Sequence, residues 1–487
     1  MMTDVRTNFP HHQTDTNTET GTGTAIFLPA HSWANSGLAP EWNDLGDLLR
    51  RLFDHVNGCV ALRLWNGSTL RLGRLRHARR SADFTLVCHE PRTVLSLLLR
   101  SDPLRFAEAY FRCELDVEGD FFAAVNLKEA LEGMKVRMID KLQAIKVAWR
   151  LRRAIKHQKK TNSSTSVHIL KQAQAVKFHS PLESRQAIAF HYDVSNYFYA
   201  LWLDEAMVYS CAYFQSPQDP LSQAQCAKLD LICRKLLLKP GDIFLDIGCG
   251  WGALILHAAR HYGVRANGIT LSEQQLDHVQ KRVIQEGLQG QVAVALADYR
   301  DLSGLACYDK IASVGMFEHV GLKNLQTYFA TVHRLLKPGG LFLNHGITHD
   351  IEGWKKTLST EFINRYIFPD GQLDTIGNIQ RAMERSGFEI ADLESLRPHY
   401  ALTLRHWVHR LERQHTQALK YVSESVYRTW RLYMAACALE FETGEIGIYQ
   451  VLAGKRARRP LQTPLTRRHM LLKDIPVLHE IADFQVL

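Results

Sequence analysis

The sequence predicts an α/β protein, in which a mostly parallel sheet with helices on both faces follows a smaller α+β domain. From about residue 180 onward, short apolar runs alternate with segments of helical periodicity, which is the pattern of repeated strand–helix units. Ahead of that part, shorter strand-like runs surround a turn at Asn66-Gly67. The chain has 487 residues, more than one compact core usually holds, so two or three domains are expected.

The front third of the chain is expected to hold a disordered tail and a small folded domain. Residues 1–35 begin with a run rich in Thr, Asn, Asp and Gly, which buries too little apolar surface to offset the entropy of ordering. Residues 36–134 have mixed periodicity and no recognisable catalytic cluster. The elements expected there are helices over 45–53 and 94–99 and strands over 60–64, 69–72 and 84–88.

A basic segment follows over 135–179. Between 135 and 160, ten Lys or Arg residues stand against one acid, Asp140, and apolar residues such as Leu142, Ile145 and Trp149 recur at helical spacing. This pattern predicts a basic amphipathic helix, which an anionic membrane attracts, and then a flexible linker. A linker helix with a solvated charged face is an equally weighted alternative. The net charge of +9 by itself favours either nucleic acid or an anionic membrane as a partner.

Residues 180–453 are expected to form the catalytic domain, and 454–487 a basic extension. The first strand of that domain ends in DIGCGWG over 246–252 and opens directly onto a helix over 253–261. Glycines at this point let the backbone approach a ligand beyond the carboxyl end of the strand. Strands are expected over 243–247, 266–270, 292–297, 310–314 and 341–345.

The spacing of the glycines selects the class of ligand. It is G-x-G-x-G, not the G-x-G-x-x-G of dinucleotide sites, and the second strand ends in Thr270-Leu-Ser272 with no carboxylate for a ribose hydroxyl. With Asp246 two residues before the first glycine, the segment resembles the first motif of class I S-adenosylmethionine methyltransferases. A tight turn without a ligand is the alternative, and Cys249 inside the loop is interpreted as a small buried filler.

Five further segments narrow the resemblance. They are HYDVSN at 191–196, YSCAYF at 209–214, DYRDL at 298–302, GMFEHVG at 315–321 and RPHY at 397–400. Together with the glycine loop they resemble the cyclopropane-fatty-acyl-phospholipid synthase family, which includes the mycolic acid cyclopropane synthases, over about residues 190–450. The resemblance implies a Rossmann-like class I methyltransferase domain with a seven-stranded, mostly parallel sheet, preceded by a lipid-associated domain.

The same resemblance implies a concrete reaction. The methyl group of S-adenosylmethionine is added to a cis double bond of an unsaturated acyl chain in a phospholipid, and a bound bicarbonate ion removes a proton so that a cyclopropane ring closes. An alkene is a weak nucleophile, so the site must hold it near the methyl group in a dry channel and place negative charge near the cation. A methyl-branched or otherwise methylated product stays open as an alternative, followed by a lipid- or nucleic-acid-binding protein without catalysis.

The family motifs assign the catalytic roles residue by residue. Glu318 would accept a hydrogen bond from bicarbonate, His345 would hydrogen-bond the ion, and Tyr400 would contribute its hydroxyl and face the cation. Cys211 and Ile347 would contribute mainly backbone groups. Two alternatives remain open, since Tyr400 would also suit a core aromatic position and Cys211 a buried apolar one.

Cys437 matches a cysteine long suspected as a nucleophile in this family. It takes second rank here, because alkene methylation needs no covalent thiol and cysteine on an apolar helix face usually belongs to a core. The contacts to the cofactor also carry over from the family. They are Tyr209, Ser210, Asp246, Gly248, Cys249, Gly250, Trp251, Gly252, Thr270, Leu271, Ser272, Gln275, Asp298 and Tyr299.

The remaining expectations concern location and partners. No run of about 18 apolar residues and no secretory signal is present, which predicts a cytoplasmic protein bound peripherally to the inner face of the membrane. Unsaturated phospholipid chains at an anionic surface are the expected partner, with no nucleic acid, and the resemblance allows a homodimer. Nine scattered cysteines without C-x-x-C spacing predict reduced thiols and no metal site.

Two segments depart from the family pattern and leave the acyl chain undetermined. Relatives usually have Leu and Thr where Asn344 and Gly346 flank His345, and the segment over 368–374 lacks a usual proline.

Overall fold

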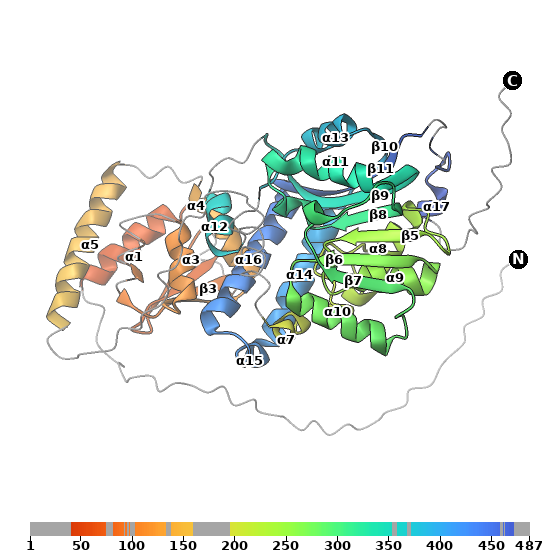
Figure 1. The fold of residues 1–487 in the computed structure, drawn as a ribbon. Helices are drawn as coiled ribbons and strands as arrows, with labels where there is room; N and C mark the ends of the chain where they lie inside the picture. The colour runs from red at the N-terminus through yellow and green to blue at the C-terminus, as the bar shows by residue number, and fades with distance from the viewer. Residues whose placement is uncertain are drawn as a thin grey trace, which may run out of the picture.

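The computed structural model places the described residues in two regions (Figure 1). We refer to residues 40–158 as the N-terminal region and to residues 195–471 as the C-terminal region. The predicted tail over 1–35, the linker over 161–166 and the start of the 191–196 motif lie outside the described residues. Described are residues 40–74, 81–91, 93–94, 97, 103–132, 138–158, 195–352, 358–367, 372–457, 461 and 463–471.

The C-terminal region is built on a seven-stranded sheet with the order β10-β11-β9-β8-β5-β6-β7. Strand β5 pairs in parallel with both β6 and β8, whereas β11 runs antiparallel to both of its neighbours. The chain order reverses between β5 and β8, which is where ligands of doubly wound sheets bind. The strands are β5 (Ile243–Ile247), β6 (Arg265–Thr270), β7 (Val292–Leu296), β8 (Tyr308–Val314), β9 (Leu336–His349), β10 (Phe388–Ser395) and β11 (Ile446–Lys455).

Helices cover both faces of this sheet, because successive strand residues point to opposite sides. In β5, Phe244 joins the core under α8, α9 and α10, whereas Leu245 joins the core under α11 and α13. Ser272 caps α10 by accepting a hydrogen bond from the backbone N–H of Gln275. These helices are α8 (Leu221–Lys235), α9 (Ala253–Tyr262), α10 (Glu273–Gln285), α11 (Leu325–Leu335) and α13 (Ile376–Arg385).

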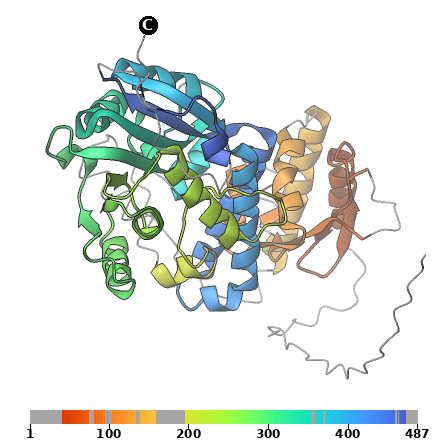
Figure 2. The ribbon, with the colours of Figure 1, turned by 90° about the vertical axis from the view of Figure 1, so that its right-hand side faces the viewer.

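Two long helices lie between the sheet and the N-terminal region, as Figures 1 and 2 both show in blue. They are α14 (Arg397–Arg413) and α16 (Glu424–Thr443). Together with the short α7 (Asn196–Ala200) they enclose an aromatic core, in which the rings of Trp202 and Trp407 lie 5.4 Å apart. The short α12 (Leu358–Tyr366) and α15 (His415–Ala418) complete this layer.

The N-terminal region has a four-stranded sheet of the order β2-β1-β3-β4. Strands β1 and β2 form the hairpin predicted at Asn66-Gly67, and β3 lies parallel to β1. Helix α5 packs against α1 at the outer edge of this region. The elements are α1 (Pro40–Leu52), β1 (Val60–Arg63), β2 (Thr69–Leu72), β3 (Phe84–Cys88), α3 (Pro103–Phe111), β4 (Leu115–Gly119), α4 (Phe121–Glu132) and α5 (Met138–Gln158).

Charged side chains join the two regions through α16. The buried guanidinium of Arg428 donates to the carbonyls of Tyr110 and Leu115, at 3.2 and 3.1 Å, and pairs with Asp116 at 3.1 Å. Because these partners belong to α3 and β4, the N-terminal region has a defined position against the helical layer.

The predicted strands and the predicted basic helix are all present, with ends that differ from the expected ones by at most five residues. Strands β4, β10 and β11 were missed, and the helix expected over 94–99 lies largely outside the described residues. The domain boundaries stay predictions, although β11 runs to Lys455 and α17 (Arg468–Leu471) packs on α8. Within the described residues, no helix combines the length and the apolar character needed to cross a membrane.

Candidate active site

The loop over 248–252 depends on glycine for its shape. Gly248, Gly250 and Gly252 have φ angles of +84°, +53° and +84°, which residues other than glycine rarely adopt. A Cβ atom at Gly248 would lie 2.9 Å from the side chain of Met316, and one at Gly252 2.8 Å from Val279. The loop therefore turns β5 sharply into α9 and leaves a hollow beyond the strand end.

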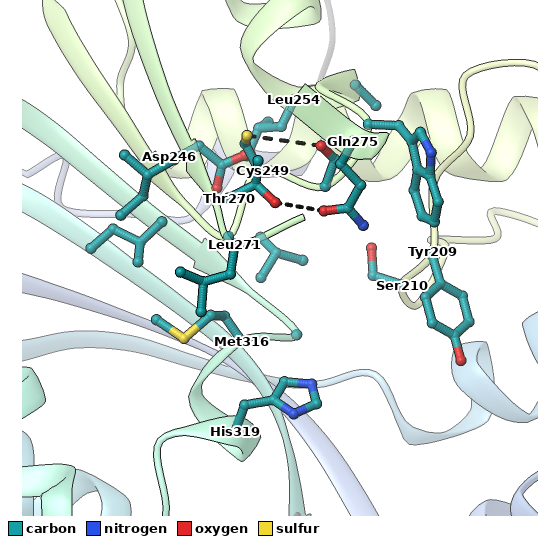
Figure 3. A pocket seen from close by; sticks show the side chains of 18 of the residues that line it. Tyr209, Ser210, Asp246, Cys249, Leu254, Thr270, Leu271, Gln275, Met316 and His319 are labelled. Carbon is teal, nitrogen blue, oxygen red and sulfur yellow. Dashed lines mark hydrogen bonds between the residues drawn. The ribbon is translucent and has the colours of Figure 1, made fainter. Parts of the chain in front are cut away.

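A pocket occupies this hollow at the carboxyl ends of β5, β6 and β8 (Figure 3). Two predicted cofactor residues do not line it, because Gly252 and Ser272 instead begin helices α9 and α10. The predicted residues that line the pocket are Tyr209, Ser210, Asp246, Gly248, Cys249, Gly250, Trp251, Thr270, Leu271, Gln275, Asp298 and Tyr299.

Side-chain hydrogen bonds hold the polar wall of the pocket in place. Thr270 Oγ1 donates to Gln275 Oε1 at 2.7 Å, so the amide nitrogen of Gln275 points toward Ser210 and the pocket (Figure 3). The indole N–H of Trp251 donates to Asn196 Oδ1 at 2.9 Å. Asn196, the last residue of the 191–196 motif, therefore helps to hold Trp251 in the pocket wall. The carboxylate of Asp298 is held by Arg300, with contacts of 2.6 and 2.9 Å.

A buried lysine that the sequence reasoning missed stands at one end of this pocket. Lys228, on α8, is 2% exposed and donates to Ser210 Oγ at 2.9 Å. Burial lowers its pKa to about 8, while nearby groups including Asp246 oppose that shift. Burial also raises the pKa of Asp246 to about 7, and its Oδ1 has no hydrogen-bond partner among the described residues. Opposite charges thus face the pocket from α8 and from the end of β5.

Glu318 and His345 are two further buried polar residues, one on the turn after β8 and the other in the neighbouring strand β9. The backbone N–H of Ile347 donates to Glu318 Oε1 at 2.7 Å, which ties the carboxyl to the end of β9. Gln450 Nε2 lies 3.1 Å from His345 Nδ1, and because an amide nitrogen only donates, Nδ1 accepts and the ring proton lies on Nε2. Burial lowers the pKa of His345 well below its ordinary value, so the ring is neutral.

Two buried polar atoms of these residues have no hydrogen-bond partner within the described part of the chain: Glu318 Oε2 and His345 Nε2. One is an acceptor and the other a donor. Unsatisfied buried polar atoms are costly, so these two atoms are candidates for contact with a polar ligand. Burial raises the pKa of Glu318 to about 7 and thereby weakens its charge.

Tyr400 and the two cysteines complete the neighbourhood. The pKa of Tyr400 is raised well above its ordinary value by burial and by the facing groups of Tyr209, Cys211, Glu318 and Cys437. Cys211 is fully buried, with Sγ 3.2 Å from the carbonyl of Ala212, as its apolar-filler alternative predicts. Burial also raises the thiol pKa of Cys437 well above 9, so that thiol stays protonated at neutral pH.

The backbone of Ile347 contacts Glu318, to which its N–H donates, and its predicted contribution to the ion site stays a prediction. Sequence reasoning also missed His319, which follows Glu318 in the same motif, lines the first pocket and has its pKa lowered to about 4 by burial.

An apolar cavity of about 180 Å³ lies between the N-terminal region and the helical layer. Its walls come from β3, α3, β4 and α4 on one side and from α12 and α16 on the other. Cys437 lines this cavity, and its thiol also raises the pKa of Tyr400. The side chains that define it include Leu104, Val117, Phe121, Phe362 and Leu432.

Residues 179–451 match the family model described as mycolic acid cyclopropane synthetase. This match covers more than half of the chain. The chain belongs to that family. It is therefore an S-adenosylmethionine-dependent methyltransferase of the mycolic acid cyclopropane synthetase family, with the α/β fold that the sequence predicts.

Relatives in other organisms resemble the chain over different lengths. A probable fatty acid methyltransferase from Pseudomonas putida is 40% identical over 398 residues, which is 81% of this chain and 92% of that protein. The cyclopropane-fatty-acyl-phospholipid synthase of Escherichia coli K12 is 42% identical over 274 residues, which is 56% of this chain and 68% of that protein.

Solved structures of the family cover the C-terminal region. The cyclopropane synthase MmaA2 from Mycobacterium tuberculosis is 37% identical with a TM-score of 0.53, over 57% of this chain and 99% of that one. The mycolic acid cyclopropane synthase CmaA1 in complex with SAH and CTAB is 36% identical with a TM-score of 0.53, over 56% of this chain and 98% of that one.

Proposed function

We propose that this protein converts a cis double bond of an unsaturated phospholipid acyl chain into a cyclopropane ring, using S-adenosylmethionine as the carbon donor. The single observation that carries the proposal is the pair of unsatisfied buried atoms, Glu318 Oε2 and His345 Nε2. A simple methyl transfer to a nitrogen or oxygen nucleophile needs no such ion-binding pair.

The residues present fit a bound bicarbonate ion. His345 Nε2–H is a buried donor for an anionic oxygen, and Glu318 Oε2 is a buried acceptor for the hydroxyl of the ion. When bound, S-adenosylmethionine supplies an electrophilic methyl group and bicarbonate supplies a base. The side chains of this protein then hold the base in one orientation, and the carboxylate of Glu318 and the ring of Tyr400 favour positive charge on the substrate.

The bonds that form and break in this reaction determine what the site must provide. The π electrons of the alkene form a bond to the methyl carbon while the carbon–sulfur bond breaks toward sulfur. A C–H bond of the new methyl group then closes the ring, and its proton leaves to the base. Exclusion of water matters because water would otherwise capture the cation, and the aromatic core around Trp202, Trp407 and Tyr400 supplies a dry wall.

The apolar cavity supports an acyl chain as the substrate. It is lined mainly by aliphatic and aromatic side chains from both regions, and Cys437, whose thiol raises the pKa of Tyr400, is one of them. An acyl chain lying there would bring its double bond toward Glu318. The proposal places the protein peripherally at the inner face of an anionic membrane, where such chains are found.

We expect purified protein with S-adenosylmethionine to add one CH₂ to the unsaturated chains of phospholipid vesicles and to give cyclopropyl proton signals by NMR. Vesicles of saturated phospholipid are the matched control and should show no change, because they offer no π electrons. Unsaturated vesicles that gain no carbon after full incubation would contradict the proposal.

A methyl-branched unsaturated product is the second candidate. It is favoured by the Pseudomonas putida relative, a probable fatty acid methyltransferase that the chain matches over 92% of its length. Such a product has the same mass as the cyclopropane, but it retains a double bond that takes up hydrogen under mild catalytic reduction. A product that gives no cyclopropyl signals and takes up hydrogen would favour this candidate over the cyclopropane.

Replacing Lys228 by methionine is expected to weaken binding of S-adenosylhomocysteine at least about tenfold, or about 1.4 kcal/mol. The buried ammonium group donates to Ser210 at the pocket wall, and it is placed to attract the carboxylate of the amino acid part of the cofactor. Titration calorimetry measures the change directly, without turnover.

Lys235→Met is the matched control for this variant. Lys235 lies on the same helix and is 1% exposed, but it pairs with Asp392 and Glu394 and does not line the pocket. The Lys235→Met variant should have a lower unfolding temperature than the parent protein and a cofactor affinity within about twofold of the parent's. If both variants change cofactor affinity equally, Lys228 does not contact the cofactor as proposed.

A further inference from the structure

Helix α5 carries an apolar face that is exposed in the part of the chain that the structure describes. Its inner face packs against α1, where Asp140, Val147 and Ala148 are buried. Side-chain contacts of Arg51 with Gln143 and of Arg150 with Asp44 hold the two helices together. The position of α5 in the fold is therefore set by this inner face alone.

The outer face of α5 exposes four large apolar side chains, Ile139, Leu142, Ile145 and Trp149, which are 55% to 63% exposed. At about 100° of rotation per residue, these positions fall within roughly one third of the helix circumference, opposite the packed face. Figure 1 shows α5 as the outermost helix of the N-terminal region, on the side away from the seven-stranded sheet. A contiguous apolar stripe of this kind at a protein surface marks an interaction site.

Helix α5 is strongly basic. Its sequence holds six Lys or Arg residues, and Lys146 is exposed one position after Ile145 of the stripe. Asp140 is the only acid in the helix, and it belongs to the buried face. An apolar line with a tryptophan on a basic helix is complementary to a surface that offers hydrocarbon beneath negative charge.

We propose that this face of α5 docks the protein on anionic phospholipid bilayers, with Leu142, Ile145 and Trp149 inserted among the acyl chains and Lys146 at the headgroups. The inference rests on the proposed function, which requires access to chains in a membrane. The same N-terminal region supplies β3, α3, β4 and α4 to the apolar cavity, so one rigid unit carries both the docking face and a wall of the proposed acyl site.

The test measures sedimentation of the full-length protein with vesicles of phosphatidylglycerol and phosphatidylcholine, without S-adenosylmethionine. Leu142→Ser/Ile145→Ser removes apolar contacts, and Lys146→Glu reverses charge. Each is expected to lower vesicle binding by at least about tenfold. Ile284→Ser/Leu305→Ser is the matched control, because it removes two equally exposed apolar side chains from the C-terminal region; it should bind as the parent protein does.

Three further readouts make the result specific. Parent protein should bind vesicles of phosphatidylcholine alone at least about tenfold more weakly than the mixed vesicles. The α5 variants should keep the circular dichroism spectrum and unfolding temperature of the parent. Their turnover of phospholipid dispersed in detergent should also match the parent, whereas their turnover of vesicles falls.

The outcomes separate the two proposals. Unchanged vesicle binding by both α5 variants would overturn the docking face. So would a shift of the α5 variants from dimer to monomer in sedimentation velocity, because the stripe would then cover a second copy of this chain. If the α5 variants lose vesicle binding but the parent forms no product from any lipid, the docking face stands and the proposed reaction falls.

Discussion

Glu318→Gln is expected to reduce turnover on the order of 10²- to 10⁴-fold while making the protein more stable above pH 7. In the proposed reaction the buried carboxylate orients the base and favours the cation, and a neutral amide lacks the negative charge for both. The glutamine oxygen can still accept from the N–H of Ile347, so the local geometry survives. Activity assays on unsaturated vesicles and thermal unfolding over a range of pH measure the two effects.

The sign of the stability change follows from the pKa of Glu318. Burial raises that pKa from 4.5 to about 7, so the folded protein binds the proton more tightly than the unfolded chain does. The stabilisation from the protonated carboxyl is complete below about pH 4.5 and is lost as pH rises through about 7. Glutamine cannot ionise, so the variant should gain relative stability across this window, on the order of 1–3 kcal/mol at pH 8.

The same pKa predicts that turnover by the parent protein increases as pH rises through about 7, since the ionised carboxylate is the useful form. Glu352→Gln is the control, because Glu352 is an exposed carboxyl on the segment after β9. It should change neither activity nor the pH profile. A Glu318→Gln protein that is less stable at every pH, or that keeps full activity, would assign this residue a structural role only.

The sequence predicts those parts of the site that neighbouring residues form, and it misses those that residues far apart in the chain form together. The glycine loop is local, since strand, turn and helix follow one another within ten residues, and its place in the pocket was predicted correctly. The pairing of His345 with Gln450 is not local, because it arises from the register of β9 against β11 across 105 residues. A single sequence carries no signal of that register.

Lys228 shows why the charged residues of the pocket were harder to predict. In the sequence it lies in an ordinary amphipathic helix, where lysine usually faces solvent. The structure buries it because α8 packs on the sheet exactly where β5 ends, so that the lysine meets Ser210 and the pocket. Strands β10 and β11 were missed for a related reason, because their pairing partners are set by tertiary contacts.

Gly346→Ala is expected to destabilise the protein by about 1–3 kcal/mol and to lower activity at least about tenfold. Gly346 lies in β9 between His345 and Ile347, and a Cβ atom there would overlap the ring of Phe317. That ring is 3% exposed and packed in the core under α11, so it has little room to move away. The sequence showed Gly346 only as a departure from the family pattern; the structure explains it by this close contact.

The loss of activity follows from chain connectivity. Phe317 immediately precedes Glu318, and Glu318 is bonded to the N–H of Ile347 on the other side of Gly346. A methyl group that pushes the ring away from β9 therefore also pulls the carboxylate from its place beside His345. Displacement of a catalytic group by a fraction of an ångström is enough to reduce turnover substantially.

A double-mutant cycle tests this account of Gly346. Phe317→Leu removes the ring, so Gly346→Ala should cost at least about 1 kcal/mol less in that background than in the parent. Gly377→Ala is the matched control, because Gly377 lies in α13 with open space around the position of its Cβ, and it should be neutral or slightly stabilising. Additive costs of Gly346→Ala and Phe317→Leu would show that the ring does not require glycine at this position.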